Sequence, residues 1–281
     1  MYITVKKEDS VISILLFIFN VFLLDRGITQ IPLKKIFQVL VPFQKNESAI
    51  RMGLSREIRN GMLINKKHNN ETYYHLTDKA INSFKHWIKT MDYNQQMMKY
   101  QLSDWNGTWN ILMLHNSNAE KDYWDELIQT LSRLKFGNLD KNIWISPYHI
   151  PSQIEFLQKK YQLDKNLFLF ESCLNTANTP TDLAKKIWPI KKLGTRYNQY
   201  LDSLSTVVYY SDTKVRLNGD ELPLLYSYGL KLFEIVQDDP RLPIQVLPSD
   251  WLGIEAVKKF TELRSKLLPK AYEYINNILG D

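Results

Sequence analysis

The stretch Glu47–Thr77, "ESAIRMGLSREIRNGMLINKKHNNETYYHLT", decides the fold of the first third of the chain. At 100° per residue, the residues before Asn60 divide into two arcs of one helix. The arc expected to pack holds Ala49, Ile50, Gly53, Leu54 and Ile58. The other arc holds Ser48, Arg51, Met52, Ser55, Arg56 and Arg59. We therefore predict a helix over Glu47–Asn60, capped by Asn46, that packs on one face and carries positive charge on the other.

The residues after this helix predict a β-hairpin. Two strand-like runs, Met62–Lys67 and Thr72–Leu76, flank the four residues His68–Glu71, "HNNE". Short runs of this kind around a polar linker are typical of a hairpin, here with about four loop residues.

Two more helices are predicted before this stretch. Ser10 can cap a helix over Val11–Leu24, "VISILLFIFNVFLL", which Gly27 ends, and Pro32 suits the first turn of a helix to about Leu40. The apolar run has 14 residues, whereas a span of the bilayer needs about 20. No small-residue cleavage site follows it, so we expect a buried helix and no membrane contact. Three helices followed by a hairpin is the order of the winged helix-turn-helix.

The positive charge of the chain is concentrated in the same region. The net charge is +6, and Met1–Thr90 holds 14 of the 36 basic residues but only 7 of the 30 acidic ones. A basic domain joined to neutral ones is the electrostatic pattern expected for contact with nucleic acid or an anionic membrane. A basic surface that is merely solvated is the alternative.

The middle of the chain predicts a second domain after a helical connector over residues 78–99. Strand and helix patterns then alternate in the order βαββαβ, which is the split βαβ or ferredoxin-like arrangement. The predicted elements are Gly107–Leu114, Glu120–Lys135, Gly137–Leu139, Ile143–Ser146, Pro151–Tyr161 and Leu167–Glu171.

The remainder is expected to be mostly helical. The helical stretches are Pro180–Leu201, Glu221–Asp238 and Trp251–Leu279, with a proline-rich segment, "DDPRLPIQVLPSDW", before the last one. The chain is thus predicted to be an α+β protein with three domains, over residues 1–92, 93–178 and 179–281. Its single cysteine, Cys173, suits a reducing cytosol and a place in the core, so we expect a cytoplasmic protein.

Several segments together resemble the phenylacetate-degradation repressor family, the PaaX-like transcriptional regulators. They are "ESAIRMGLSREIRNGMLINKK" with "YYHLT", "WNGTWNILML", "FGNLDKNIWISP" and "DDPRLPIQVLPSDW". The segments occur in the family's order and span most of the chain.

The resemblance implies a bacterial repressor with an N-terminal winged helix, a central ferredoxin-like domain similar to small CRISPR-associated nucleases, and a C-terminal helical domain. It also implies a homodimer on operator DNA that an acyl-coenzyme A, such as phenylacetyl-coenzyme A, releases. Arg51, Ser55, Arg56 and Arg59 fall in the family's recognition-helix pattern. Lys66, Lys67, Tyr73 and Tyr74 fall in its wing, where we also expect Asn69 and Asn70 to reach DNA.

The sequence departs from the family pattern at two places. The wing reads "HNNE" where relatives are rich in arginine and glycine, and Met52-Gly53 replaces a Thr-Ala-like pair. A glycine inside a helix costs roughly 1 kcal/mol relative to alanine. Either Gly53 permits a close helix approach or the position is suboptimal. Met52 can offer an apolar contact to a thymine methyl group.

Catalysis is not expected. Nucleases with the ferredoxin-like fold hold a metal through an aspartate at the end of the first strand, but here His115 and Asn116 follow that strand, and the first carboxylate is Glu120. The histidines and Cys173 show no metal-ligand spacing, and no glycine-rich phosphate loop or hydrolase motif occurs. We expect no metal and no cofactor.

The predicted function is a sequence-specific DNA-binding regulator with an aromatic or acyl effector. Aromatic and cationic residues suited to such a ligand are Trp144, Trp188, Lys192, Arg196, Tyr197 and Tyr200. The alternatives are a non-catalytic module that binds a ligand or a protein, and, third, a ferredoxin-like nuclease.

Overall fold

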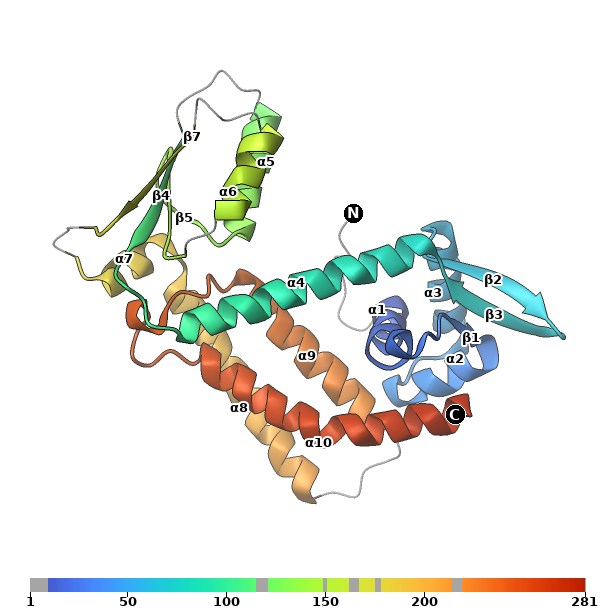
Figure 1. Cartoon of the computed structure of the whole chain (residues 1–281). Coiled ribbons are helices and arrows are strands. Elements are labelled where there is room, and N and C mark those ends of the chain that lie inside the picture. Colours follow the sequence, from blue (N-terminus) through green and yellow to red (C-terminus); the bar gives the residue numbers. More distant parts are fainter. Residues whose placement is uncertain are drawn as a thin grey trace. The chain divides into compact units, whose positions relative to one another are not determined.

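The computed structural model describes residues 10–114, 121–148, 151–161, 167–174, 178–213 and 219–280. The chain forms two compact units. The first unit comprises Met1–Asp92, Asn198–Val236 and Gly253–Asp281, and the second comprises Tyr93–Tyr197 and Gln237–Leu252. Figure 1 labels most of the helices and strands of both.

The N-terminal helices of the first unit begin where their capping residues predict. α1 (Val11–Ile18) continues through a π-helical turn, Phe19–Leu23, and a 3-10 turn, Leu24–Arg26, to Gly27 at a φ of 72°. The Ser13 amide donates to Ser10 Oγ at 3.1 Å. α2 (Leu33–Leu40) follows Pro32, and α3 (Glu47–Arg59) begins after Asn46, whose Oδ1 accepts from the Ala49 amide at 2.8 Å.

The first unit also contains an antiparallel sheet, whose strand order is β1-β3-β2. Its strands are β1 (Gln30–Pro32), β2 (Leu63–His68) and β3 (Glu71–Leu76). His68 pairs with Glu71, so the loop has two residues and the predicted four-residue loop is wrong. Asn69 and Asn70 have φ values of 46° and 64°, and asparagine tolerates the left-handed conformation that a tight two-residue turn requires.

The helices near the C-terminus contribute to the first unit. In α10 (Gly253–Leu279), Tyr272 Oη donates to the Val21 carbonyl at 2.8 Å and Tyr274 Oη to the Gln38 carbonyl at 3.0 Å. Parts of α8 (Ile190–Thr213) and α9 (Glu221–Asp238) also belong to this unit. The three-domain division at residues 92 and 178 stays a prediction, and α8 and α9 each contribute to both compact units.

The second unit is built on an antiparallel sheet in the strand order β5-β6-β4-β7. Its strands are β4 (Trp109–Leu114), β5 (Gly137–Asp140), β6 (Ile143–Ser146) and β7 (Leu167–Ser172). α4 (Asp78–Leu102) leads into the sheet, and α5 (Lys121–Arg133) and α6 (Pro151–Tyr161) lie together on one of its faces (Figure 1).

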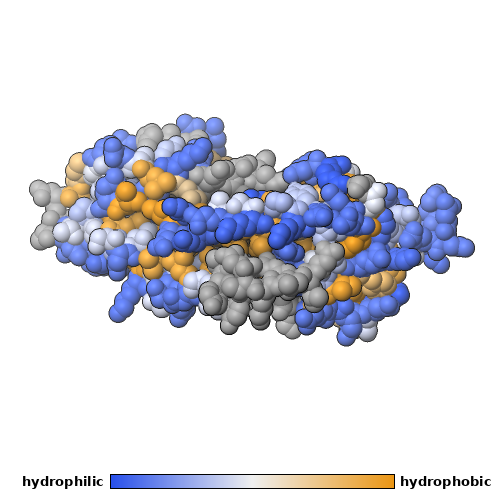
Figure 2. Space-filling view, turned by 90° about the horizontal axis from the view of Figure 1, so that it is seen from below, coloured by the Kyte–Doolittle hydropathy of each residue, from blue (hydrophilic) through white to orange (hydrophobic). Residues whose placement is uncertain are grey.

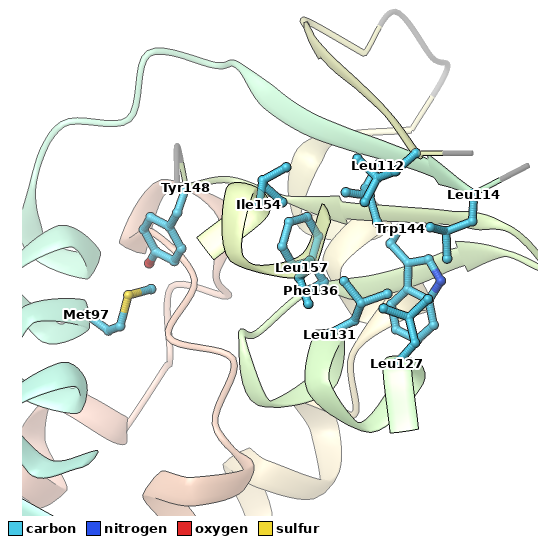
Figure 3. Close-up of a cluster of buried hydrophobic side chains, with 11 residues drawn as sticks. Met97, Leu112, Leu114, Leu127, Leu131, Phe136, Trp144, Tyr148, Ile154 and Leu157 are labelled. Carbon is cyan, nitrogen blue, oxygen red and sulfur yellow. The ribbon is translucent and has the colours of Figure 1, made fainter. Parts of the chain in front are cut away.

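Residue alternation along the strands divides the core of the second unit between the two faces of the sheet. On one face, α5 and α6 pack against the cluster drawn in Figure 3, where Leu127 and Leu131 lie with Trp144 and Leu112. On the other face, Trp109 and Ile145 pack with residues of α7 (Pro180–Ile187).

The predicted continuous helix Pro180–Leu201 is wrong, because α7 ends at Ile187 and α8 begins at Ile190. Trp188 between them is extended, at φ −110° and ψ 152°. Its successor, Pro189, disfavours the helical conformation at the preceding residue. The prediction of an α+β protein is confirmed, since the structure mixes helices with two antiparallel sheets.

No helix among the described residues combines the length and the apolar character that crossing a membrane requires. Hydrophilic residues cover most of the surface visible in Figure 2, with apolar residues showing between them.

Candidate nucleic-acid interface

α3 exposes the arc that its periodicity predicts. Ile50 and Leu54 are buried, whereas the residues of the opposite arc are exposed. We call this arc the basic face, and it consists of Ser48, Arg51, Met52, Ser55, Arg56 and Arg59. Met52 is 65% exposed in the middle of three arginines, so an apolar side chain faces water at a position that internal packing does not explain.

Gly53 lies where α3 approaches α1. A Cβ atom at this position would lie 3.0 Å from Val11 Cβ and Cγ1, which is tighter than ordinary van der Waals contact. The close approach of the two helices therefore explains the glycine. Of the two explanations for Gly53, a close helix approach and a suboptimal position, the first applies.

Glu57 is a buried acid on α3 that the sequence analysis did not assign. Its side chain is 6% exposed and accepts a bond from Asn60 Nδ2 at 3.0 Å. Its spacing of three from Leu54 and seven from Ile50 places it on the packing arc, so periodicity alone could have found it. Its charge consequently faces away from the basic face and does not neutralise it.

Arg51 is held in place on the basic face by two neighbours. Its Cζ lies 5.0 Å from the centroid of the Phe37 ring on α2, and its Nη2 lies 3.7 Å from Glu47 Oε2. The pair is 57% and 72% exposed, so the ion pair adds little stability. The ring contact nevertheless restricts the guanidinium and orients it before any partner arrives.

The hairpin β2–β3 presents its lysines on opposite faces. Lys66 pairs with Tyr73 and Lys67 with Thr72, and adjacent residues of a strand point in opposite directions. Both lysines and the turn residues Asn69 and Asn70 are exposed.

The tyrosines of β3 differ in their surroundings. Tyr74 is buried opposite Ile31 of β1, so it supports the hairpin from the core side. Tyr73 is half-buried, and its Oη donates to Glu71 Oε2 at 3.3 Å. Desolvation, and after it the Glu71 carboxylate, raise the pKa of Tyr73.

The residues predicted for an effector lie at separate places. Trp144 belongs to the cluster under α5 and α6, whereas Trp188 stacks on Trp109 on the other face of the sheet, at 6.2 Å between ring centroids and an interplanar angle of 19°. Because the sheet lies between them, these two tryptophans do not line one pocket.

The predicted effector residues of α8 are also divided. Lys192 is exposed, and Arg196 Nη1 lies 2.5 Å from Asp238 Oδ2. Tyr197 is buried in the second unit, while Tyr200 belongs to the first unit and packs against Tyr228. Binding of an effector by this set stays a prediction.

The residues on which the nuclease alternative depends, His115, Asn116 and Glu120, lie outside the described residues. Within the described ranges, no group of three or more His, Cys, Asp and Glu side chains is placed to hold a metal ion. Cys173 is exposed, so its predicted place in the core is wrong. It follows the last residue of β7, a strand whose residues after Leu167 are already exposed.

Comparison with known proteins identifies the family. Three family descriptions match successive segments: "PaaX-like protein" over residues 13–80, "PaaX protein central Cas2-like domain" over residues 102–184, and "PaaX-like protein C-terminal domain" over residues 188–277. The chain is 20% identical over 239 residues to the transcriptional repressor PaaX of Escherichia coli (strain K12), covering 82% of this chain and 72% of the repressor.

This similarity supports transcription regulators as the class of protein. The chain belongs to the PaaX-like family.

Among solved structures, the uncharacterized protein Rv0674 of Mycobacterium tuberculosis has a similar fold. The TM-score is 0.61 at 16% sequence identity, over 92% of this chain and 97% of that one.

Proposed function

We propose that this protein is a sequence-specific DNA-binding transcription regulator whose N-terminal helices and hairpin form a winged helix-turn-helix. The observation that carries the proposal is the basic face of α3, which exposes three arginines and two serines on one side of a helix whose other side packs. A helix of this kind fits the major groove, where arginine and serine reach phosphates and base edges.

Two contacts on the basic face would read bases rather than phosphates. Arg51 is oriented by Phe37 and can place its guanidinium against a guanine, the most common specific contact in the major groove. Met52 can pack on a thymine methyl group, which would account for an exposed methionine in the middle of a charged face.

The hairpin acts as the wing in this proposal. The side chains of Lys66 and Lys67 point to opposite faces of the hairpin. One of them would therefore contact the phosphates of one DNA strand, and the other would contact the phosphates of the second strand, across the groove. Asn69 and Asn70 at the tip supply hydrogen-bonding groups without charge, so the wing contributes less electrostatic affinity than an arginine-rich one.

The second unit is proposed to be ferredoxin-like and non-catalytic. Its βαββαβ element order and its β5-β6-β4-β7 antiparallel sheet support that arrangement. By the same proposal, the protein acts as a homodimer on a two-fold symmetric operator, and an acyl-coenzyme A effector releases it. The name of the relative, a transcriptional repressor, favours repression as the direction.

The experiment is a comparison of variants by fluorescence anisotropy on duplex DNA from upstream of the protein's own gene. Arg51→Ala and Arg56→Ala should each weaken binding by about 1–3 kcal/mol, because each removes a phosphate or base contact. Arg264→Ala is the matched control, since Arg264 is an exposed arginine of α10 in the same unit. If all three variants bind like the wild type, α3 is not the recognition helix.

A salt titration separates this proposal from a module that binds protein. Phosphate contacts release counterions, so the logarithm of the affinity falls linearly with the logarithm of the salt concentration. Each lost phosphate contact should reduce that slope by about 1 in the arginine variants. An apolar protein contact would give little slope.

A further inference from the structure

A polar cluster is buried in the second unit, next to the start of the proline-rich segment. Asp239 is 0% exposed, Arg241 is 1% exposed and Lys135 is 8% exposed. Asp239 Oδ2 accepts from Tyr197 Oη at 2.7 Å, and Asp239 Oδ1 accepts from the Arg241 amide at 2.7 Å. Tyr148 Oη donates to the Arg241 carbonyl. These hydrogen bonds involve the carboxylate of Asp239 and the backbone of Arg241, and none of them involves the Arg241 guanidinium.

The unpaired groups of the cluster are donors. Within the part of the chain that the structure describes, the buried Arg241 Nε and Nη1 have no hydrogen-bond partner, and neither has the buried Trp251 Nε1. Arg241 Nη1 lies 3.9 Å from Asp239 Oδ2, which is beyond hydrogen-bond distance. The Trp251 ring packs edge-on against Tyr197, the residue that donates to Asp239, with 5.5 Å between centroids.

The cluster also buries more positive than negative charge. Two cations, Lys135 and Arg241, are buried with one carboxylate, Asp239. The next carboxylate, Asp238, is 61% exposed and pairs with Arg196. Lys135 Nζ donates to a neutral acceptor, the Gln237 carbonyl, at 2.5 Å. Burial of Lys135 and the nearby Arg241 charge lower its pKa to about 8, although Asp239 opposes the change.

Buried N–H donors without acceptors are unfavourable, and a buried charge without a partner more so. Guanidinium and ammonium groups together recognise carboxylates and phosphates, and an indole N–H adds a neutral donor. We propose that Lys135, Arg241 and Trp251 form a binding site for one small anionic group, a carboxylate or a phosphate. The site names the ligand class for the effector role proposed above, and it uses Tyr197 as the residue that positions Asp239.

Arg241 is 1% exposed, so an anion reaches it only when the surrounding residues open. Binding is therefore expected to be in slow exchange. A titration should add a second set of signals for the bound state and leave the first set in place.

The test uses the full chain labelled with ¹⁵N and observes the arginine Nε–H signals by NMR, without DNA. Sodium acetate and sodium phosphate are the probes, and sodium chloride at equal ionic strength is the control. Arg241→Lys identifies the Arg241 signal by its loss. The expected result is a saturable second Arg241 signal with acetate or with phosphate and none with chloride, and the anion that saturates first identifies the group.

Two variants make the test specific. Lys135→Met should weaken the apparent affinity at least about tenfold, since it removes one of two cations. Lys159→Gln should leave the affinity unchanged, because Lys159 is an exposed lysine of α6 in the same unit and lies outside the cluster. Binding should also weaken as the pH rises through about 8, where Lys135 loses its proton.

The inference is overturned if neither probe produces a second signal, if chloride acts equally, or if Lys135→Met binds as tightly as the wild type. DNA plays no part in this measurement, so its outcome is independent of the recognition-helix proposal. A protein that binds its DNA specifically and neither anion would overturn this inference alone.

Discussion

Gly53 illustrates how one residue reports a tertiary contact. Helix propensity alone makes glycine a poor choice at this position, by roughly 1 kcal/mol relative to alanine. The structure supplies the reason, since Val11 of α1 lies 3.0 Å from the place a Cβ would take. The sequence left two explanations open, and only the packing of α1 on α3 separates them.

A larger side chain at Gly53 should destabilise the first unit. Gly53→Leu forces a branched side chain against Val11, and overpacking of this kind costs about 1–3 kcal/mol. Ser55→Leu is the control, because Ser55 is exposed on the basic face of the same helix. Urea unfolding should give a lower midpoint for Gly53→Leu only. Equal midpoints for the two variants would mean that α1 does not pack as closely as described.

Lys135 should make the stability depend on pH in an unusual direction. Its folded-state pKa is about 8 and its unfolded value 10.5, so between these values the unfolded state binds more protons and the stability rises with pH. The rise from pH 8 to about pH 10 should be about 2 kcal/mol. Above about pH 10 the buried Tyr197 and Tyr200 oppose it, because their raised pKa values keep them protonated only in the folded state.

The Lys135→Met variant checks this assignment. Urea unfolding across the same pH range should lose the rise, since the methionine side chain cannot titrate. A rise that persists in the variant would show that another group is responsible.

At the scale of elements, the hairpin turn sets the geometry of the proposed wing. Asn69 and Asn70 both have positive φ, and the register pairs His68 directly with Glu71. Sequence patterns identify a hairpin here but give a four-residue loop, because the runs that look like strands end one residue short on each side. Only the pairing partner of each residue settles the register, and that is a tertiary property.

The turn can be tested with a pair of variants at one position. Asn70→Val places a β-branched residue in the left-handed conformation and should cost about 1–2 kcal/mol. Asn70→Gly, the matched control, adopts that conformation freely and should be neutral or stabilising. Urea unfolding compares the two, and a valine variant as stable as the glycine variant would contradict the two-residue turn.

The elements that the sequence predicts well share strong periodicity or clear capping signals. α3, α6 and the strands of the second sheet fall within a residue or two of their predicted bounds. Two features were missed for different reasons. β1 has three residues and exists because the distant strand β3 pairs with it. The break at Trp188 depends on the adjacent Pro189, which a reading of amphipathic periodicity passes over.

The same distinction applies to the candidate sites. The exposure of the basic face follows from its spacing alone, so sequence could place it. The contact of Arg51 with Phe37 and the buried cluster around Arg241 could not be predicted, because they join residues from different elements. Aromatic and cationic residue types suggested an effector pocket, but residue type does not say that Trp144 and Trp188 lie on opposite faces of one sheet.

At the scale of the whole molecule, the chain combines a basic first unit with a second unit that buries cations. The similarity to the PaaX repressor supports transcription regulation as the functional class of the chain. In the proposed account, the first unit supplies the DNA contacts through α3 and the hairpin, and the second unit supplies the ligand site. Two-fold symmetry of a homodimer then predicts an operator with half-sites about one helical turn apart or a multiple of it.

The measurement that tests the central claim most directly is the ratio of affinities for two duplexes. Fluorescence anisotropy would compare DNA from upstream of the protein's own gene with a shuffled duplex of the same composition, across salt concentrations. The account predicts that the upstream duplex binds about 10³-fold or more tightly and survives competitor DNA. Equal, weak and steeply salt-dependent binding to both duplexes would contradict it, because that is the behaviour of a basic surface without sequence recognition.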